Sequence, residues 1–310
     1  MRGVKSQIIL NHKRYLMGVA ILLICLLHAL VQANITFVPV TFLNVCVDIF
    51  LIMSAIGCSI SMEKNQIKTF YRNRFVKVLP IFAIYSIIQT AVTSYYGEPV
   101  TFVDYVCNAT TLSFWGLGGW YQEWYVCASF ALWLSLPFFV FITKKLSLLP
   151  CFISIALVVI IMLHMEIKPQ YSLFISRIPI FMFGVFLFVK KESPTWIFLP
   201  VIFIALFLGI YNVYCGDKLC VSLLSPIILC ALIPINSYLP KPVLQFTQKL
   251  GGKTLEIYLA NILAMYIIGL DNSNLNWFSA FILNFASTCI LSLFFISINH
   301  IIKRICLKFQ

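Results

Sequence analysis

The chain has 310 residues, of which 61% are hydrophobic and only 10% are charged, and its mean hydropathy is +0.97. This composition excludes an ordinary water-soluble globular protein, because too few polar residues are present to cover its surface. The net charge of +12 would suit a nucleic-acid partner, but the positions of the basic residues favour a membrane topology instead.

Long apolar stretches recur from residue 15 almost to the end of the chain. A helix needs about 20 mostly apolar residues to cross the hydrocarbon core of a bilayer. We therefore predict an all-α, polytopic membrane protein, a bundle of about ten transmembrane helices that forms a single domain over residues 1–310. The predicted spans are 15–34, 38–60, 78–96, 124–143, 147–166, 172–189, 193–211, 219–236, 255–270 and 276–299.

The basic residues follow the rule that short loops rich in Lys and Arg stay on the cytoplasmic side. With a cytoplasmic N-terminus, the ten spans place 19 of the 22 Lys and Arg residues on that side, and the exceptions are Lys168, Arg177 and Lys218. Topology thus explains the charge without a nucleic-acid partner. We expect a multi-pass protein of the cell (inner or plasma) membrane, in contact with lipid, with both termini in the cytoplasm. The sequence gives no oligomeric state.

The first two predicted spans each contain one titratable side chain, His28 and Asp48. Such a group costs several kcal/mol in hydrocarbon unless it has a partner, so it is typical of a functional site. Histidine, with an unperturbed pKa of about 6.5, can remove a proton from a hydroxyl at neutral pH, and a carboxylate on its far nitrogen would orient the ring. A buried hydrogen bond that joins two helices is the alternative.

The segment from 63 to 77, between the second and third predicted spans, carries five basic residues. Such a segment usually reflects the topology rule and attraction to anionic lipid. A sharper hypothesis is that Arg74 and Lys77, three residues apart on one helical face, hold phosphate groups of a cytoplasmic donor.

The longest predicted outer connection, 96–123, is rich in glycine and aromatic residues. These residues suit either a segment that stacks on a sugar ring or an aromatic belt at the membrane interface. None of the eleven cysteines has the spacing of a metal site, and we expect no metal.

Six segments in the same order along the chain resemble the acyltransferase-3 family, membrane enzymes with about ten spans that transfer acyl groups, often acetyl, to sugar hydroxyls of surface glycans. The segments are 16–20 with His28, 47–55, 70–80, Trp124 with Pro137, 177–181 with Gly184, and Gly251 with Tyr258 and Leu259.

The resemblance implies a membrane O-acyltransferase that uses His28 as general base, oriented by Asp48. It implies acyl-CoA, most simply acetyl-CoA, as the donor substrate, no tightly bound cofactor, and a surface or lipid-linked glycan as acceptor. The residues expected to bind the donor are Arg74, Lys77, Arg72 and Arg14. Those expected to bind the acceptor are Arg177, Tyr258, Asn261, Trp124 and Trp120.

The chain also departs from the family pattern. Met17 stands where the family has a basic residue, Ser129 where many members have a carboxylate, and Asn261 where a histidine is frequent. Two alternatives therefore stay open. One is a proton-coupled transporter in which His28 and Asp48 form a relay, and the other is a catalytically inactive relative that serves glycan assembly.

Overall fold

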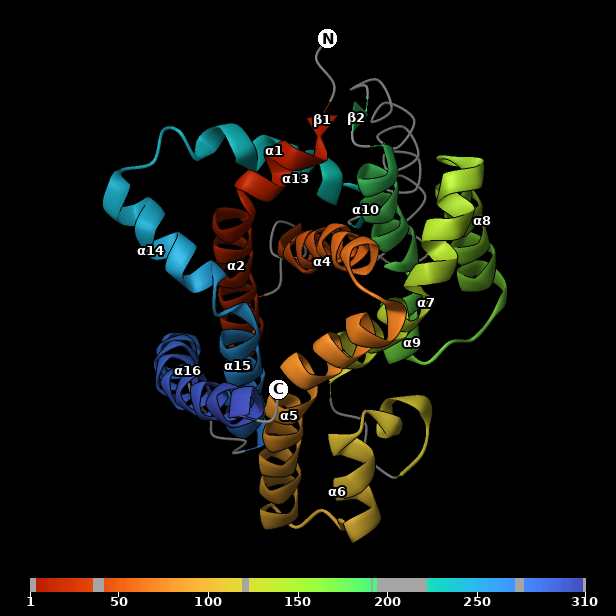
Figure 1. The fold of residues 1–310 in the computed structure, drawn as a ribbon. Helices are drawn as coiled ribbons and strands as arrows, with labels where there is room; N and C mark the ends of the chain where they lie inside the picture. Colours follow the sequence, from red (N-terminus) through yellow and green to blue (C-terminus); the bar gives the residue numbers. More distant parts are fainter. Residues whose placement is uncertain are drawn as a thin grey trace. The chain divides into compact units, whose positions relative to one another are not determined.

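The computed structural model describes residues 4–35, 42–118, 123–190, 192–193, 222–270 and 276–308. This part of the chain is helical, apart from two antiparallel two-residue strands, β1 (Val4–Lys5) and β2 (Glu192–Ser193) (Figure 1). The all-α prediction is therefore confirmed for the described residues, apart from these two short strands. The chain folds as two compact units, the first formed by 1–20, 41–67 and 128–252, and the second by 21–40, 68–127 and 253–310.

Six stretches of helix in the described part of the chain are long and apolar enough to cross a membrane. They are α2 (Lys13–Gln32), α4 (Val45–Lys64), α5 (Ile67–Tyr95), α7 (Trp124–Leu146), α9 (Pro169–Ile175) together with α10 (Ile178–Lys190), and most of α16 (Trp277–Lys308).

Three further apolar helices are shorter than a usual span, namely α8 (Leu149–His164), α13 (Ser225–Ile235) and α15 (Thr254–Leu270). The predicted count of ten spans is therefore not confirmed, and the span predicted at 193–211 lies outside the described residues except for Ser193. The remaining short helices are α1 (Ser6–Asn11), η1 (Phe42–Asn44), α6 (Phe102–Ala109), η2 (Leu112–Trp115) and α14 (Lys241–Gly251).

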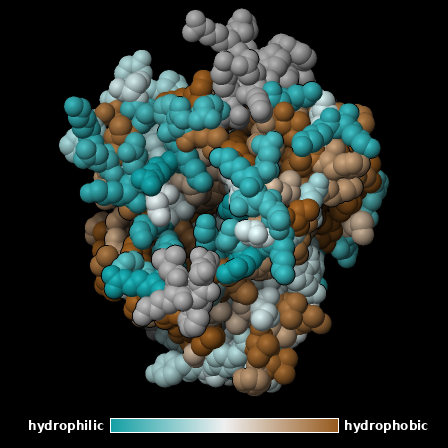
Figure 2. All heavy atoms as spheres, viewed as in Figure 1, coloured by the Kyte–Doolittle hydropathy of each residue, from teal (hydrophilic) through white to brown (hydrophobic). Residues whose placement is uncertain are grey.

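Many large apolar side chains are exposed, as expected where lipid replaces water (Figure 2). On α16, for example, Ile290 and Leu293 are 69% and 68% exposed, and on α7 Phe138 is 61% exposed. Together with the long apolar helices, these surfaces identify a multi-pass membrane protein.

In the first unit, α4 is the most buried of the long helices, and α10 packs directly against it. A Cβ atom added at Gly184 of α10 would lie 2.7 Å from Cβ of Ala55 and 3.0 Å from the carbonyl oxygen of Ile52. Only a glycine permits this close approach of the two backbones. The close packing positions the start of α10, and with it Arg177, beside α4.

The backbones of α2 and α14 are in direct contact. A Cβ atom at Gly18 would lie 1.9 Å from the carbonyl oxygen of Thr247, and one at Gly251 would lie 1.8 Å from that of Arg14. These distances are far below van der Waals contact, so either substitution must separate the helices.

We expect Gly251→Ala to lower the free energy of unfolding by about 1–3 kcal/mol, because an added methyl group in a filled contact forces the backbones apart. The neighbouring Gly252→Ala is a matched control, since its Cβ would lie 3.4 Å from the nearest atom. Thermal unfolding of both proteins in detergent measures the difference, and equal midpoints would contradict the observed packing.

In the second unit, α15 and α16 pack together along their lengths. The helix α6 has its polar residues inside, with Asp104 and Asn108 buried, whereas Phe102 and Val106 are exposed. A capping box between Thr101 and Asp104 fixes the start of this helix.

Candidate active site

His28 lies in the second half of α2 and is half-buried. Its Nδ1 lies 2.5 Å from Oδ1 of Asn261, which is fully buried on α15. The amide nitrogen of Asn261 in turn donates to Oγ1 of Thr288 at 3.0 Å and to Oδ1 of Asn284 at 3.3 Å, both on α16. Three helices of the second unit thus hold the imidazole through one asparagine.

The orientation of the Asn261 amide sets the tautomer of His28. The amide oxygen only accepts hydrogen bonds, so Nδ1 of the neutral imidazole must carry the proton, and Nε2 is left with a lone pair. In the structure the oxygen of the amide faces His28, and its nitrogen donates to Asn284 and Thr288. An imidazole that donates from one nitrogen and keeps the lone pair of the other is the arrangement that proton abstraction from a hydroxyl requires.

A second polar pair lies one turn earlier on α15. The hydroxyl of Tyr258 donates to Oε1 of Glu123 at 2.5 Å, and the backbone N–H of Tyr125 donates to the same oxygen at 3.1 Å. Glu123 directly precedes α7 and is 3% exposed. Burial raises the pKa of the Glu123 carboxyl to about 7, although both hydrogen bonds favour its ionised form.

The raised pKa predicts that the protein becomes less stable as the pH rises. The folded state holds the Glu123 proton more tightly than the unfolded state, so the protonated carboxyl adds to the free energy of unfolding. This added stability is complete below pH 4.5 and is lost as the pH passes 7. The loss amounts to at most about 3 kcal/mol. We expect the midpoint of thermal unfolding to fall more between pH 5 and pH 8 in the wild type than in Glu123→Gln.

The control for this measurement is Glu98→Gln, because Glu98 is an exposed carboxylate of the same unit. It should retain the pH dependence of the wild type. A Glu123→Gln protein whose midpoint changes with pH as strongly as the wild type would show that Glu123 does not titrate in this range.

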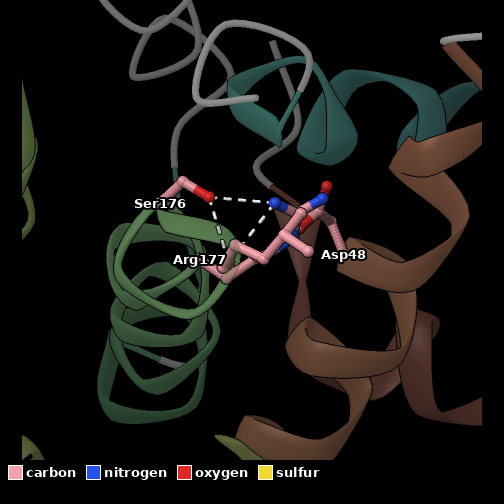
Figure 3. A network of polar contacts seen from close by, with 4 residues as sticks. Asp48, Ser176 and Arg177 are labelled. Carbon is pink, nitrogen blue, oxygen red and sulfur yellow. Dashed lines mark hydrogen bonds and ion pairs between the residues drawn. The ribbon is translucent and has the colours of Figure 1, made fainter. Parts of the chain in front are cut away.

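Asp48 and Arg177 form a buried ion pair in the first unit (Figure 3). Nε of Arg177 lies 3.6 Å from Oδ1 of Asp48, and Nη1 of Arg177 donates to Oγ of Ser176 at 2.9 Å and to the carbonyl oxygen of Leu173 at 3.3 Å. Asp48 is on α4, and Arg177 is in the turn between α9 and α10. The arginine side chain predicted to bind the acceptor thus has a carboxylate as its neighbour.

The predicted catalytic residues therefore have different partners, His28 an asparagine and Asp48 an arginine. They belong to different units, so the hypothesis that Asp48 orients His28 stays a prediction. Asn261, expected to bind the acceptor, bonds His28 directly. Tyr258, of which the same was expected, bonds Glu123.

Three of the four residues predicted to bind the donor lie near the start of α5. Arg72 and Lys77 are exposed, and the guanidinium of Arg74 lies 5.7 Å above the ring of Phe70. Arg14, the fourth, is exposed on α2 and belongs to the other unit.

Of the tryptophans predicted to bind the acceptor, Trp124 begins α7 and makes an edge contact with the ring of Tyr125. Trp120 lies outside the described residues.

Sequence reasoning missed several residues of these clusters. Asn284 and Thr288 had a detectable signal, since two polar residues four apart in an apolar span share one helical face. Glu123 ends the predicted outer connection 96–123, and its pairing with Tyr258 was not predicted. Ser176, which bonds Arg177, is a common residue with no distinguishing pattern.

A scan against family models matches residues 14–298 to the acyltransferase-3 model, described as an acyltransferase domain. No curated protein and no solved structure matches the chain significantly. The family match covers both units and includes His28, Asp48, Arg177 and Asn261. The chain therefore belongs to the acyltransferase-3 family and is a membrane acyltransferase.

Proposed function

We propose that the protein transfers an acetyl group from acetyl-CoA to a hydroxyl of a surface or lipid-linked glycan, with His28 as the general base. The observation that carries this proposal is the hydrogen bond between Nδ1 of His28 and Asn261, because it leaves Nε2 as the basic nitrogen. The family match supports acyl transfer in general, and the donor, the acceptor and the roles of the residues are our proposal.

In the proposed reaction, Nε2 of His28 takes the proton of the acceptor hydroxyl while the oxygen attacks the thioester carbonyl. The tetrahedral intermediate then collapses and the C–S bond breaks. The departing sulfur takes the proton from the imidazolium, which gives free CoA and the acetylated sugar. Asn261 holds the ring in place throughout, because its oxygen accepts a hydrogen bond from Nδ1–H in both the neutral and the charged state of the imidazole.

The donor site in this proposal includes Arg72, Arg74 and Lys77. They lie on the first three turns of α5, where the charge pattern predicts the cytoplasmic side. Guanidinium and ammonium groups suit the phosphates of CoA. Arg14 is a further donor residue in the proposal. We also place the protein in the cell membrane with both termini in the cytoplasm.

Assays of the purified protein distinguish this function from its two alternatives, a proton-coupled transporter and a catalytically inactive glycan-assembly protein. An acyltransferase releases CoA from acetyl-CoA only when an acceptor glycan is present, whereas a transporter in liposomes gives counterflow of a labelled solute without consuming acetyl-CoA. A glycan-assembly protein without catalysis gives neither signal. Acceptor-dependent CoA release supports the proposal, and its absence with glycan extracted from the native membrane would overturn it.

A further inference from the structure

We propose that α14 lies flat on the cytoplasmic face of the bilayer, where one row of its side chains enters the lipid and a neighbouring row of lysines binds anionic phospholipid headgroups. This lipid site would exist whether or not the protein transfers acetyl groups. All of the residues that form it belong to the first unit.

The helix α14 lies between two apolar helices in the chain and cannot itself cross a membrane. It has 11 residues, a length of about 16 Å at 1.5 Å per residue, whereas the hydrocarbon core is about 30 Å thick. It follows α13 and precedes α15. With a cytoplasmic N-terminus, the predicted topology places this connection on the cytoplasmic side. We therefore expect α14 at that surface of the bilayer.

One side of α14 packs within the protein. Thr247 and Gly251 are buried, and both contact α2 (Figure 1). Residues four apart lie on the same side of a helix, so these two contacts fix which side of α14 faces the protein. The contacts are between backbones, which leaves α14 no room to turn about its axis. The opposite side is therefore held at the surface in one orientation.

The exposed side of α14 carries two rows of side chains, one basic and one apolar. Lys241, Gln245 and Lys249 are exposed and four residues apart, so they form one row. Val243 and Phe246 are 46% and 56% exposed and three residues apart, so they form the other. A basic row beside an apolar row matches the two layers of a bilayer surface, the headgroups and the acyl chains.

Charge complementarity favours anionic lipid as the partner of this surface. The segment 236–252 contains two lysines and no acidic residue, and the cytoplasmic leaflet carries negatively charged lipids. Lysine can keep its stem along an apolar surface while its ammonium group reaches the headgroup phosphates. Tyr238, just before the helix, is 85% exposed, as is typical of tyrosine at the level of the headgroups. The surface thus offers groups to both layers of the leaflet.

Photolabelling of the full-length protein in lipid nanodiscs tests this site without requiring catalysis. The probes are phosphatidylglycerol and phosphatidylcholine with the same diazirine in one acyl chain, and mass spectrometry identifies the labelled residues. We expect labels on Val243 and Phe246, with about 5–30-fold more from the anionic probe, because each lysine near an anionic surface contributes about fivefold. Lys241→Gln combined with Lys249→Gln should remove this preference.

The matched control removes the same charge elsewhere in the first unit. Lys144 and Lys145 are exposed at the end of α7, and Lys144→Gln combined with Lys145→Gln should keep the preference for the anionic probe at α14. Lys241→Arg combined with Lys249→Arg keeps the charge and should keep the preference as well. Labelling of the exposed apolar face of α16 should be the same in every variant, which reports that the protein stays folded in the bilayer.

Equal labelling of α14 by the two probes would overturn the lipid site, as would an unchanged ratio in the glutamine variant. Labelling of Val243 and Phe246 by a water-soluble carbene reagent, with none from either lipid, would place the helix in water and have the same consequence. Gly251 contacts Arg14, which belongs to the proposed donor site, so excess CoA serves as a competitor. Loss of the anionic label on addition of CoA would assign the lysines to the donor and would also overturn the lipid site. Because no step needs acyl transfer, failure of the proposed function would leave these results unchanged.

Discussion

Replacement of His28 by alanine is expected to lower the rate of acyl transfer by about 10²–10⁴-fold, the usual contribution of a general base. The loss should appear in kcat, because the imidazole acts on the acceptor proton in the transition state and contributes little to ground-state binding. Release of CoA from acetyl-CoA in the presence of acceptor glycan gives the measurement.

The control for this prediction is His12→Ala. His12 belongs neither to the His28–Asn261 cluster nor to the Asp48–Arg177 pair, and its Nδ1 bonds the backbone oxygen of Ile8 in the same helical turn. It should keep the rate of the wild type. A His28→Ala protein that folds normally and transfers acetyl groups at a similar rate would remove the histidine from the mechanism.

The second large effect is expected at the Asp48–Arg177 ion pair. Both side chains are almost completely buried, so removal of one partner leaves a charge without compensation in an apolar surrounding. Asp48→Leu and Arg177→Met alone should each lower the free energy of unfolding by about 3–5 kcal/mol, whereas the double variant should be much closer to the wild type. Unfolding of the four proteins in mixed detergent micelles completes the double-mutant cycle.

The same cycle separates a structural role of Asp48 from a catalytic one. If Asp48 and Arg177 act only by pairing with each other, the double variant should recover activity together with stability. If either side chain also takes part in catalysis or in acceptor binding, the double variant should be stable and inactive. Single variants that unfold like the wild type, or losses that simply add, would contradict the ion pair.

The sequence could locate His28, Asp48 and Arg177 but could not assign their partners. His28 and Asp48 were recognisable as lone titratable residues in apolar spans, and Arg177 as the arginine of a span. Hydrophobic periodicity shows that a residue lies in a membrane helix, but it does not show which helices are neighbours. The ion pair of Arg177 with Asp48 and the hydrogen bond of His28 with Asn261 depend on that packing.

Hydropathy alone also could not predict the number of spans. The prediction at 147–166 corresponds to α8, which has 16 residues, and the prediction at 255–270 to α15, which has 17. Both are apolar, and both are shorter than the approximately 20 residues of a simple span. A hydropathy pattern reports an apolar run without showing whether the helix crosses the bilayer completely.

Asn261 stands where the family often has a histidine, and its contacts show what the asparagine does in this chain. The sequence comparison with the family marked this position as a loss, because a histidine is frequent there. In the structure the asparagine connects α2, α15 and α16 and fixes the imidazole at one nitrogen. A neutral amide can orient the base as a carboxylate would, although it stabilises the imidazolium less strongly.

The tautomer of His28 is the most direct test of this account, and NMR of protein labelled with ¹⁵N-histidine can measure it, with His28→Ala to assign the signal. We predict a proton on Nδ1 and a free lone pair on Nε2, and we expect Asn261→Leu to lose this preference while Asn284→Leu weakens it. A His28 ring that carries its proton on Nε2, or whose tautomer is unchanged in Asn261→Leu, would contradict the account.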